Sequence, residues 1–373
     1  MKFLATIAFG LEGVLKNELI LLGMDVKSTN MGSVVYEGKI DSLVWANSCL
    51  RTPDRIYWVL DEFEALSFDE LFENILNYPF EDIMPSNAKI IVNAKSYKSK
   101  VYSLRDIQKI SKKAIVKRFS NKKGIKYMDE TGEEYPILVK IEKNHVYLLL
   151  DTTGIPLHKR GYRRDSRLAP IRENFAAGLI LLSRWFGKGV FIDPMCGSGT
   201  IAIEAALIGK NIPPGINRKF LFEKWGILSK KDVDKNRQSI KSGIKNDISL
   251  EIRASDIDKT AIKYAKNNAK NAGVSKDIVF ANRDISDLKT EFTGGTVVTN
   301  MPYGKRLGTE EELKNLEKMV DEKILTLETY RLGILSANDR FSQHKKRKVS
   351  KVRKFYNARI ETFFYQYEPT KRW

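Results

Sequence analysis

The spacing of apolar residues predicts a first half of the chain that mixes short strands and helices. Residues 1–66 favour a strand at 2–9, a helix at 11–22, a strand at 33–36, a helix at 43–50 and a strand at 55–60. Residues 67–156 favour a helix at 68–77, a strand at 89–94, a helix from 103 to 119 and paired strands at 137–141 and 146–151. Ser103 and Asp106 have the spacing of a capping box at the start of the helix at 103–119. We expect two small α+β units.

Residues 157–373 follow a different pattern, in which short apolar runs alternate with amphipathic stretches. Strands are predicted up to Asp193 and at 250–255, 278–281, 296–299, 331–336 and 360–367, with helices at 171–186, 201–208 and 259–271. A polar, basic excursion at 210–248 interrupts the alternation. This order is typical of an α/β fold with a doubly wound, Rossmann-like sheet, in which ligands bind at the carboxyl ends of the strands.

The stretch Phe191-Ile-Asp-Pro-Met-Cys-Gly-Ser-Gly-Thr200 joins a predicted strand to a predicted helix. Gly197 and Gly199 permit close backbone approach, Asp193 places a carboxylate at the strand end, and Thr200 is expected to cap the helix. The same turn fits a dinucleotide-binding pattern, whose ribose-binding acid lies about 20 residues beyond the glycines. The acid available here, Asp256, follows Gly199 by 57 residues, which disfavours a nicotinamide dehydrogenase.

Polar residues also follow the next predicted strands. These are Asp256-Ile-Asp258, Asp284 and Asn300-Met-Pro-Tyr-Gly304. A single Asp after a strand is more often a turn former or a helix cap. Because the carboxyl ends of parallel strands share one rim of a sheet, the series together favours a site for a ligand that carries a nucleoside.

Charge is distributed unevenly along a chain whose net charge is +18. Residues 89–126 carry a net +12, residues 157–172 a net +5 and residues 340–373 a net +9, which leaves −8 for the remainder. Segregated basic segments favour a phosphate-backbone partner over the alternative of an ordinary solvated surface. The two cysteines and three histidines do not suggest a disulfide framework or a metal site. Without a long apolar run or a signal-peptide pattern, a soluble cytoplasmic protein is expected.

These motifs, with Leu157-His-Lys-Arg-Gly-Tyr-Arg163 and the 103–119 helix, resemble the THUMP-domain branch of the class I S-adenosylmethionine-dependent RNA methyltransferases. The likeness extends over nearly the whole chain, and bacterial 23S rRNA guanine-N2 methyltransferases resemble it most. It implies a ferredoxin-like lobe at 1–66, a THUMP RNA-binding domain at 67–156 and a Rossmann-like methyltransferase domain at 157–373. It also implies S-adenosylmethionine as the cofactor, an RNA substrate and no metal.

The resemblance also implies roles for individual residues. Asn300, the carbonyl of Met301, Pro302 and Tyr303 would receive the target amine and base, although Met301 stands where the family usually has proline. Methionine would keep the needed carbonyl but loosen the restraint that proline places on φ of this turn. The cofactor would contact Asp193, Pro194, Cys196, Gly197, Ser198, Gly199, Thr200, Asp256, Ile257 and Asp284. We expect RNA phosphates to contact Lys95, Lys98, Lys100, Lys109, Lys112, Lys113, Lys159, Arg160, Arg163, Lys345, Lys346 and Arg347.

Alternatives remain open at this point. Transfer RNA is an alternative substrate to ribosomal RNA, because both kinds of RNA carry the same modification. An adenine-N6 methyltransferase would use the same Asn-x-Pro-Tyr chemistry, and a target base in a paired helix would have to be flipped out in either case. An RNA-binding assembly factor without activity would bind RNA and show no affinity for the cofactor.

Overall fold

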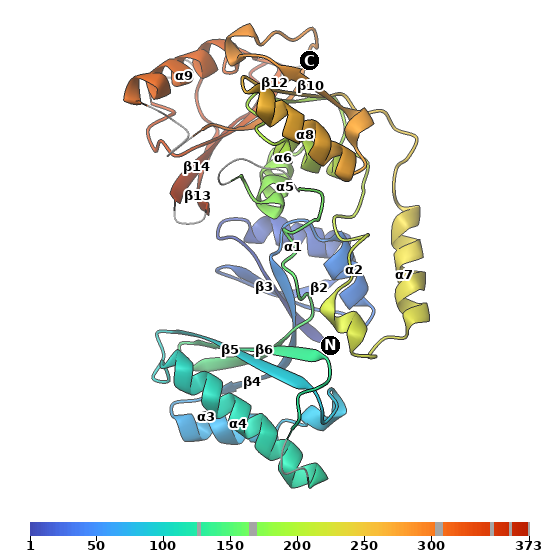
Figure 1. The fold of residues 1–373 in the computed structure, drawn as a ribbon. Coiled ribbons are helices and arrows are strands. Elements are labelled where there is room, and N and C mark those ends of the chain that lie inside the picture. Colours follow the sequence, from blue (N-terminus) through green and yellow to red (C-terminus); the bar gives the residue numbers. More distant parts are fainter. Residues whose placement is uncertain (125–127, 164–169, 303–308, 344–346, 358–359, 372–373) are drawn as a thin grey trace.

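The computed structural model describes residues 1–124, 128–163, 170–302, 309–343, 347–357 and 360–371. Figure 1 shows an elongated chain in which the C-terminal half lies at one end, residues 67–151 lie at the other, and the first lobe lies between them. None of the helices in the described part of the chain has the length and apolar composition of a membrane span.

One seven-stranded sheet runs through both N-terminal units. Its order is β2-β3-β1-β4-β7-β6-β5, and only β5 and β6 are parallel. Its strands are β1 (Lys2–Thr6), β2 (Asp25–Asn30), β3 (Ser33–Glu37), β4 (Arg55–Glu64), β5 (Lys89–Tyr97), β6 (Glu134–Glu142) and β7 (His145–Asp151). The sequence pattern missed β2, whose residues are mostly exposed and polar. The long strand β4 joins the two units, because it pairs with β1 on one side and β7 on the other.

Helices pack against this sheet through their apolar faces. They are α1 (Glu12–Leu21), α2 (Ser42–Cys49), α3 (Phe68–Asn77) and α4 (Leu104–Lys123). Ser67 caps α3 by accepting a hydrogen bond from the Glu70 N–H at 3.1 Å. The capping box predicted at Ser103 is wrong, because the Ser103 hydroxyl donates to the Asp106 carboxylate and caps no backbone N–H.

The C-terminal half is the expected doubly wound α/β fold. Its sheet order is β10-β9-β8-β11-β12-β14-β13, parallel except for β14, which is antiparallel to both β12 and β13. The strands are β8 (Val190–Asp193), β9 (Ile252–Asp256), β10 (Ile278–Asn282), β11 (Gly295–Asn300), β12 (Tyr330–Ser336), β13 (Lys351–Asn357) and β14 (Ile360–Tyr367). The helices are α5 (Glu173–Leu182), α6 (Thr200–Gly209), α8 (Lys259–Asn271) and α9 (Glu310–Lys323). The sequence pattern missed α9 and β13 and began α5 too early.

The excursion at 210–248 links the two halves. It contains a short 3-10 helix, Leu221–Lys224, and α7 (Lys230–Ser242), which lies along α2 (Figure 1). Asn236 on α7 accepts a hydrogen bond from the Trp45 indole at 2.8 Å. Trp225 stacks on Tyr135 of β6 with 4.9 Å between ring centroids. The C-terminal half therefore contacts both N-terminal units.

Candidate functional site

A cavity of about 910 Å³ lies at the carboxyl ends of β8, β9, β10 and β11. It is lined by Pro170, Ile171, Asp193, Pro194, Met195, Cys196, Gly197, Ser198, Thr200, Ile201, Asp256, Ile257, Asp258, Ala261, Tyr264, Asp284, Ile285, Asn300, Pro302 and Leu316. The rim expected from the sequence therefore exists. Its volume suits a ligand the size of a nucleoside with a substituent.

The glycine turn at this rim needs glycine at two positions for different reasons. Gly197 has φ +54° with open space around it, whereas Gly199 has φ +83° and lies against α8. A Cβ on Gly199 would lie 2.9 Å from the Cβ of Ala265. Gly199 is the N-cap of α6, so the capping role predicted for Thr200 is wrong, and Thr200 is the first helical residue.

Asp256 holds two parts of the rim together. Its carboxylate accepts from the Gly197 N–H at 2.8 Å and from the Asp258 N–H at 3.0 Å. Asp258 in turn caps α8 by accepting from the Thr260 N–H at 2.8 Å. The carboxylate of Asp256 thus fixes the glycine turn relative to the start of α8, and it still lines the cavity.

Asp193 is fully buried at the end of β8. One carboxylate oxygen accepts from the Thr299 hydroxyl at 3.0 Å, while the other has no hydrogen-bond partner among the described residues. Burial, with a smaller contribution from the nearby Asp256, raises the pKa of Asp193 to about 7, although the Thr299 hydroxyl and the Met195 backbone act to lower it. A buried acceptor without a donor is costly, so this oxygen favours a ligand that brings a cationic donor.

Asn300 ends β11 and presents a second buried acceptor. Its side-chain oxygen has no hydrogen-bond partner among the described residues. The next residue, Met301, has a buried side chain and does not line the cavity. Its N–H donates to the Leu335 carbonyl at 2.9 Å, which continues the pairing of β11 with β12.

The cavity is acidic. The described lining residues include four carboxylates, those of Asp193, Asp256, Asp258 and Asp284, and no lysine, arginine or histidine. Such a lining attracts cations and repels a diphosphate. This electrostatic character opposes the dinucleotide alternative that the glycine turn alone left open. Among the described residues, no group of three or more metal-ligating side chains is present.

The structure brings most of the predicted rim residues together and adds others. Gly199 and Met301 support the cavity without lining it, and Tyr303 lies outside the described residues. Sequence reasoning missed Pro170, Ile171, Tyr264 and Leu316. Nothing in the local pattern marks them, because they come from α8, from the missed helix α9 and from the segment before α5. The assignment of rim residues to cofactor and base stays a prediction.

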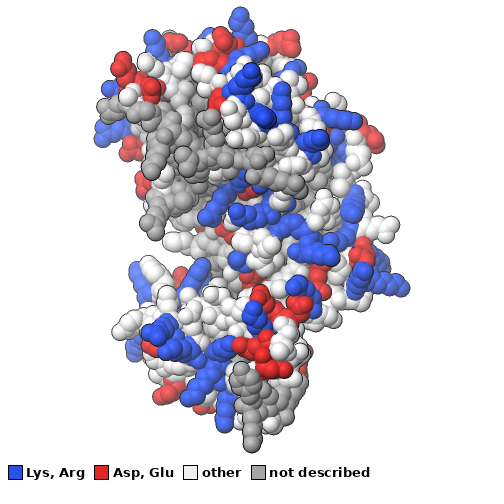
Figure 2. All heavy atoms as spheres, in the orientation of Figure 1, with Lys and Arg blue, Asp and Glu red and all other residues white. Residues whose placement is uncertain are grey.

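Most of the lysines predicted to contact RNA are exposed. These are Lys95, Lys98, Lys100, Lys109, Lys113 and Lys159, whereas Lys112 is half-buried and paired with Glu130 at 2.7 Å. Figure 2 shows Lys and Arg side chains gathered on the lower body, which carries α3 and α4, with acidic side chains among them. These exposed lysines remain candidates for phosphate contacts.

Three predicted RNA-binding arginines point inward instead. Arg160 is buried, donates to the carbonyls of Leu157 and Arg51, and lies 3.6 Å from Glu204. Arg347 is buried and donates to the carbonyls of Leu327, Tyr330 and Glu368. Arg163 pairs with Glu173 and donates to the Ile171 carbonyl. Lys345 and Lys346 lie outside the described residues.

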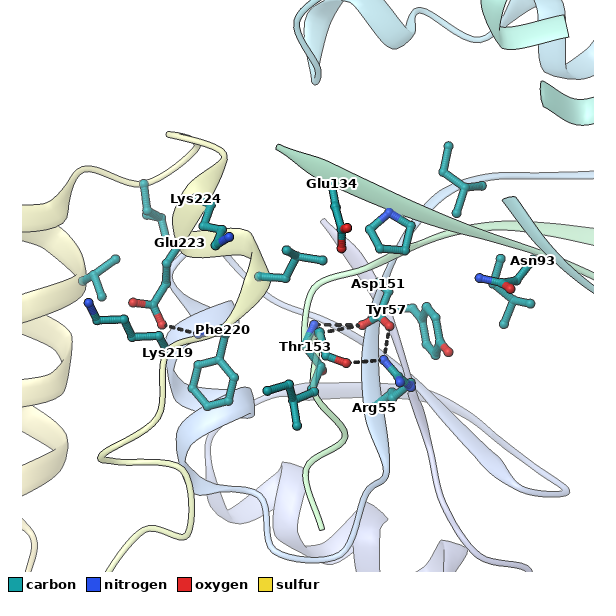
Figure 3. A pocket seen from close by; sticks show the side chains of 18 of the residues that line it. Arg55, Tyr57, Asn93, Glu134, Asp151, Thr153, Lys219, Phe220, Glu223 and Lys224 are labelled. Atoms are coloured by element: carbon teal, nitrogen blue, oxygen red, sulfur yellow. Dashed lines mark hydrogen bonds and ion pairs between the residues drawn. The ribbon is translucent and has the colours of Figure 1, made fainter. Parts of the chain in front are cut away.

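A second cavity, of about 1120 Å³, lies between the N-terminal sheet and residues 219–237, away from the rim (Figure 3). Some of its cations are paired with acids of the chain. Arg55 pairs with Asp151, and Arg237 pairs with Glu223 at 2.7 Å. The side chains that Figure 3 labels around it include both Lys219 and Glu134. This mixed lining lacks the convergent acceptors of the rim cavity.

Three family models match the chain. Residues 2–57 match the RlmL ferredoxin-like domain, residues 65–151 match the THUMP domain, and residues 160–365 match the RMKL-like methyltransferase domain.

Similar curated proteins cover most of the chain. YpsC of Bacillus subtilis, named as a candidate RNA methyltransferase, is 40% identical over 98% of this chain and 95% of its own length. The ribosomal RNA large subunit methyltransferase K/L of Syntrophotalea carbinolica is 31% identical over 97% of this chain, which spans about half (52%) of that relative. The tRNA (guanine(6)-N2)-methyltransferase of Methanocaldococcus jannaschii is 29% identical over 91% of both chains.

Solved structures share the whole fold. A methyltransferase candidate, SMU.472, solved in complex with SAH, superposes with a TM-score of 0.93 at 37% identity and covers 99% of this chain and 98% of its own. A protein of Listeria monocytogenes, described as a predicted N6-adenine-specific DNA methylase, superposes with a TM-score of 0.92 at 41% identity, covering 98% of this chain and 95% of its own.

Proposed function

The chain belongs to the RNA methyltransferase family with RlmL ferredoxin-like, THUMP and RMKL-like methyltransferase domains, and from that premise we propose that it methylates guanine N2 in RNA with S-adenosylmethionine. The observation that carries the proposal is the acidic cavity with two unpartnered buried acceptors, on Asp193 and Asn300.

The residues around the cavity fit this cofactor. The free oxygen of Asp193 would accept from the ammonium group of the methionine part, and the Asp256 carboxylate and Asp284 from ribose and adenine donors. Ile257 is 70% exposed although it lines the cavity, so it offers an apolar surface for the adenine ring. The absence of basic lining residues in the described part suits a ligand with a positive sulfur and a positive ammonium group.

Asn300 would position the target amine. S-adenosylmethionine supplies a methyl group on a positively charged sulfur and becomes S-adenosylhomocysteine when an amine nitrogen takes that methyl and releases a proton. An exocyclic amine conjugated with its ring is a poor nucleophile, and a fixed acceptor that binds its N–H orients the nitrogen lone pair. The free side-chain oxygen of Asn300 is such an acceptor, and no strong base is needed. Tyr303, in the family's aromatic position, would stack on the base.

Guanine N2 in ribosomal RNA is the proposed target. Two relatives, one named for large-subunit ribosomal RNA and one for tRNA guanine N2, support RNA as the substrate class, and the second supports guanine N2 as the position. The chain spans about half of the ribosomal relative, so the match covers only that part of the relative, and ribosomal RNA is proposed as the substrate of this chain. The Listeria structure keeps adenine N6 as the second candidate, because the same Asn-x-Pro-Tyr motif can bind that amine.

Nucleoside analysis of the product tests the proposal. The full chain is incubated with methyl-labelled S-adenosylmethionine and transcribed large-subunit rRNA or tRNA, and the RNA is digested to nucleosides. Label in N2-methylguanosine supports the proposal and identifies the RNA. Label in N6-methyladenosine overturns the guanine assignment. RNA binding with neither methyl transfer nor SAH affinity supports an RNA-binding factor.

A further inference from the structure

Arg163 follows the N-terminal half in the sequence, and its guanidinium faces the protein interior. Its side chain is 13% exposed, and it pairs with the carboxylate of Glu173, whose side chain is 3% exposed. Its Nη1 donates to the carbonyl of Ile171 at 3.0 Å. One planar group therefore joins the first residue of α5 to the backbone two residues before it.

Ile171 and the preceding Pro170 line the rim cavity. Among the described residues, Arg163 alone donates a hydrogen bond to the Ile171 carbonyl. The side chain of Ile171 is buried in the core that the first lobe shares with the C-terminal half. A shift of this carbonyl would move one wall of the cavity.

The neighbouring residue ties the same segment to two other helices of the site. The Tyr162 hydroxyl donates to Glu204 on α6 at 3.0 Å, and its carbonyl accepts from Asn271 on α8 at 3.1 Å. Both helices begin at the cavity, since Thr200 and Ile201 of α6 and Ala261 and Tyr264 of α8 line it. The segment at 162–163 is therefore anchored to α6, to α8 and to Ile171, all of which contribute to the lining of the cavity.

We propose that Arg163 is a positioning residue for the cofactor, which fixes the Pro170–Ile171 wall of the cavity through the Ile171 carbonyl and Glu173. The inference rests on the proposed function, because it takes the cavity as the cofactor site. It replaces the sequence-based expectation that Arg163 binds RNA phosphates.

The test distinguishes three roles of Arg163, which are positioning the cavity wall, stabilising the fold and contacting RNA. Arg163→Met alone would leave Glu173 buried without its cation, so the informative variant is the double substitution Arg163→Met/Glu173→Gln. Glu173→Gln alone is the matched control, since it keeps the bond from Arg163 to Ile171. Arg172→Met, at a neighbouring arginine whose side chain is 54% exposed, is the surface control. SAH affinity is measured by calorimetry well below the melting temperature of each variant, and affinity for a tRNA transcript is measured across salt concentrations.

The double variant is expected to bind SAH about tenfold more weakly than Glu173→Gln, an effect of the size of one hydrogen bond. The salt slope of RNA binding, which is the slope of the logarithm of the binding constant against the logarithm of the salt concentration, should not change. Unchanged SAH affinity together with a salt slope smaller by about one overturns the proposal in favour of an RNA contact. Unchanged SAH affinity and RNA binding with a lower melting temperature also overturns it, since Arg163 would then serve the fold alone. If the wild-type chain itself fails to bind SAH, the proposed function fails rather than this inference.

Discussion

The backbone N–H of Met301 donates to the carbonyl of Leu335 at 2.9 Å, at the position where resembling enzymes usually carry a proline. Proline would fix the backbone angle φ of this turn but has no N–H to donate. The sequence suggested that methionine loosens the turn after Asn300. The structure shows instead that methionine allows one further bond between β11 and β12 and buries its side chain among Ile285, Val320 and their neighbours.

Met301→Pro is therefore expected to destabilise the chain by about 1–3 kcal/mol, through the lost hydrogen bond and the lost packing of the side chain. Chemical denaturation measures this loss. Met301→Leu keeps the N–H and nearly the same volume, so its cost should stay below about 1.5 kcal/mol. Equal stability of the proline and leucine variants would show that the bond to Leu335 contributes nothing.

Replacing Asp193 by asparagine is expected to increase the free energy of unfolding by an amount that depends on pH. A free aspartate has a pKa of about 4, whereas the pKa of folded Asp193 is about 7. Between these values the folded state keeps a proton that the unfolded state releases, so the contribution of Asp193 to stability falls as pH rises. The free energy of unfolding of Asp193→Asn relative to wild type should increase by up to about 3 kcal/mol from pH 5 to pH 8.

Denaturant titrations at both pH values, without ligand, measure this change. Asp247→Asn, at an exposed position of the excursion, is the matched control. The same Asp193→Asn variant should bind S-adenosylmethionine at least tenfold more weakly, because the ammonium group loses its charged acceptor. If the difference in free energy of unfolding between Asp193→Asn and wild type does not increase with pH, the explanation based on the buried carboxylate is wrong.

The close approach of the glycine turn to α8 predicts unequal costs for two glycine substitutions. Gly199→Ala combines a positive φ with a Cβ 2.9 Å from Ala265, whereas Gly273→Ala has φ +75° and open space around it. The second variant should cost about 1–2 kcal/mol from backbone strain, and Gly199→Ala should cost more because α8 must shift. Thermal unfolding of both variants measures the difference. Equal losses of stability would show that α8 accommodates the new Cβ beside Ala265 without a measurable penalty.

The adjacent residues Lys159 and Arg160 should separate RNA binding from folding. Lys159 is exposed, so Lys159→Met should leave stability unchanged and reduce the salt slope of binding to a tRNA transcript by about one. Arg160→Met removes a cation beside the buried Glu204 and should cost about 3–5 kcal/mol of stability. A stable Arg160→Met variant with weakened RNA binding would restore the sequence-based interpretation of that arginine.

These arginines show where sequence reasoning ends. A strand followed by a glycine turn, or by Asp or Asn, is a local pattern, and it located Asp193, Asp256, Asp284 and Asn300 on one rim. Whether an arginine in a basic segment faces water depends on partners far away in sequence. Glu204 comes 44 residues after Arg160, and the carbonyl partners of Arg347 include Leu327 and Glu368. Composition cannot reveal such partners.

The elements that were missed have equally physical causes. Strand β13 was not predicted because Lys351, Arg353 and Lys354 interrupt its apolar residues, but an edge strand tolerates charge because one side of it faces solvent. The wall formed by Pro170 and Ile171 is recognisable only when the chain has folded back onto the rim.

The central claim is that this rim transfers a methyl group to an amine held by Asn300, and Asn300→Ala tests it most directly. Single-turnover transfer from labelled S-adenosylmethionine to the RNA that wild type modifies is compared with SAH affinity in the same variant, with Asn246→Ala at an exposed position as control. We predict a transfer rate reduced by roughly 100-fold or more with SAH affinity within about threefold of wild type, as expected for a group that positions the reacting amine. Transfer at the wild-type rate in Asn300→Ala would contradict the account.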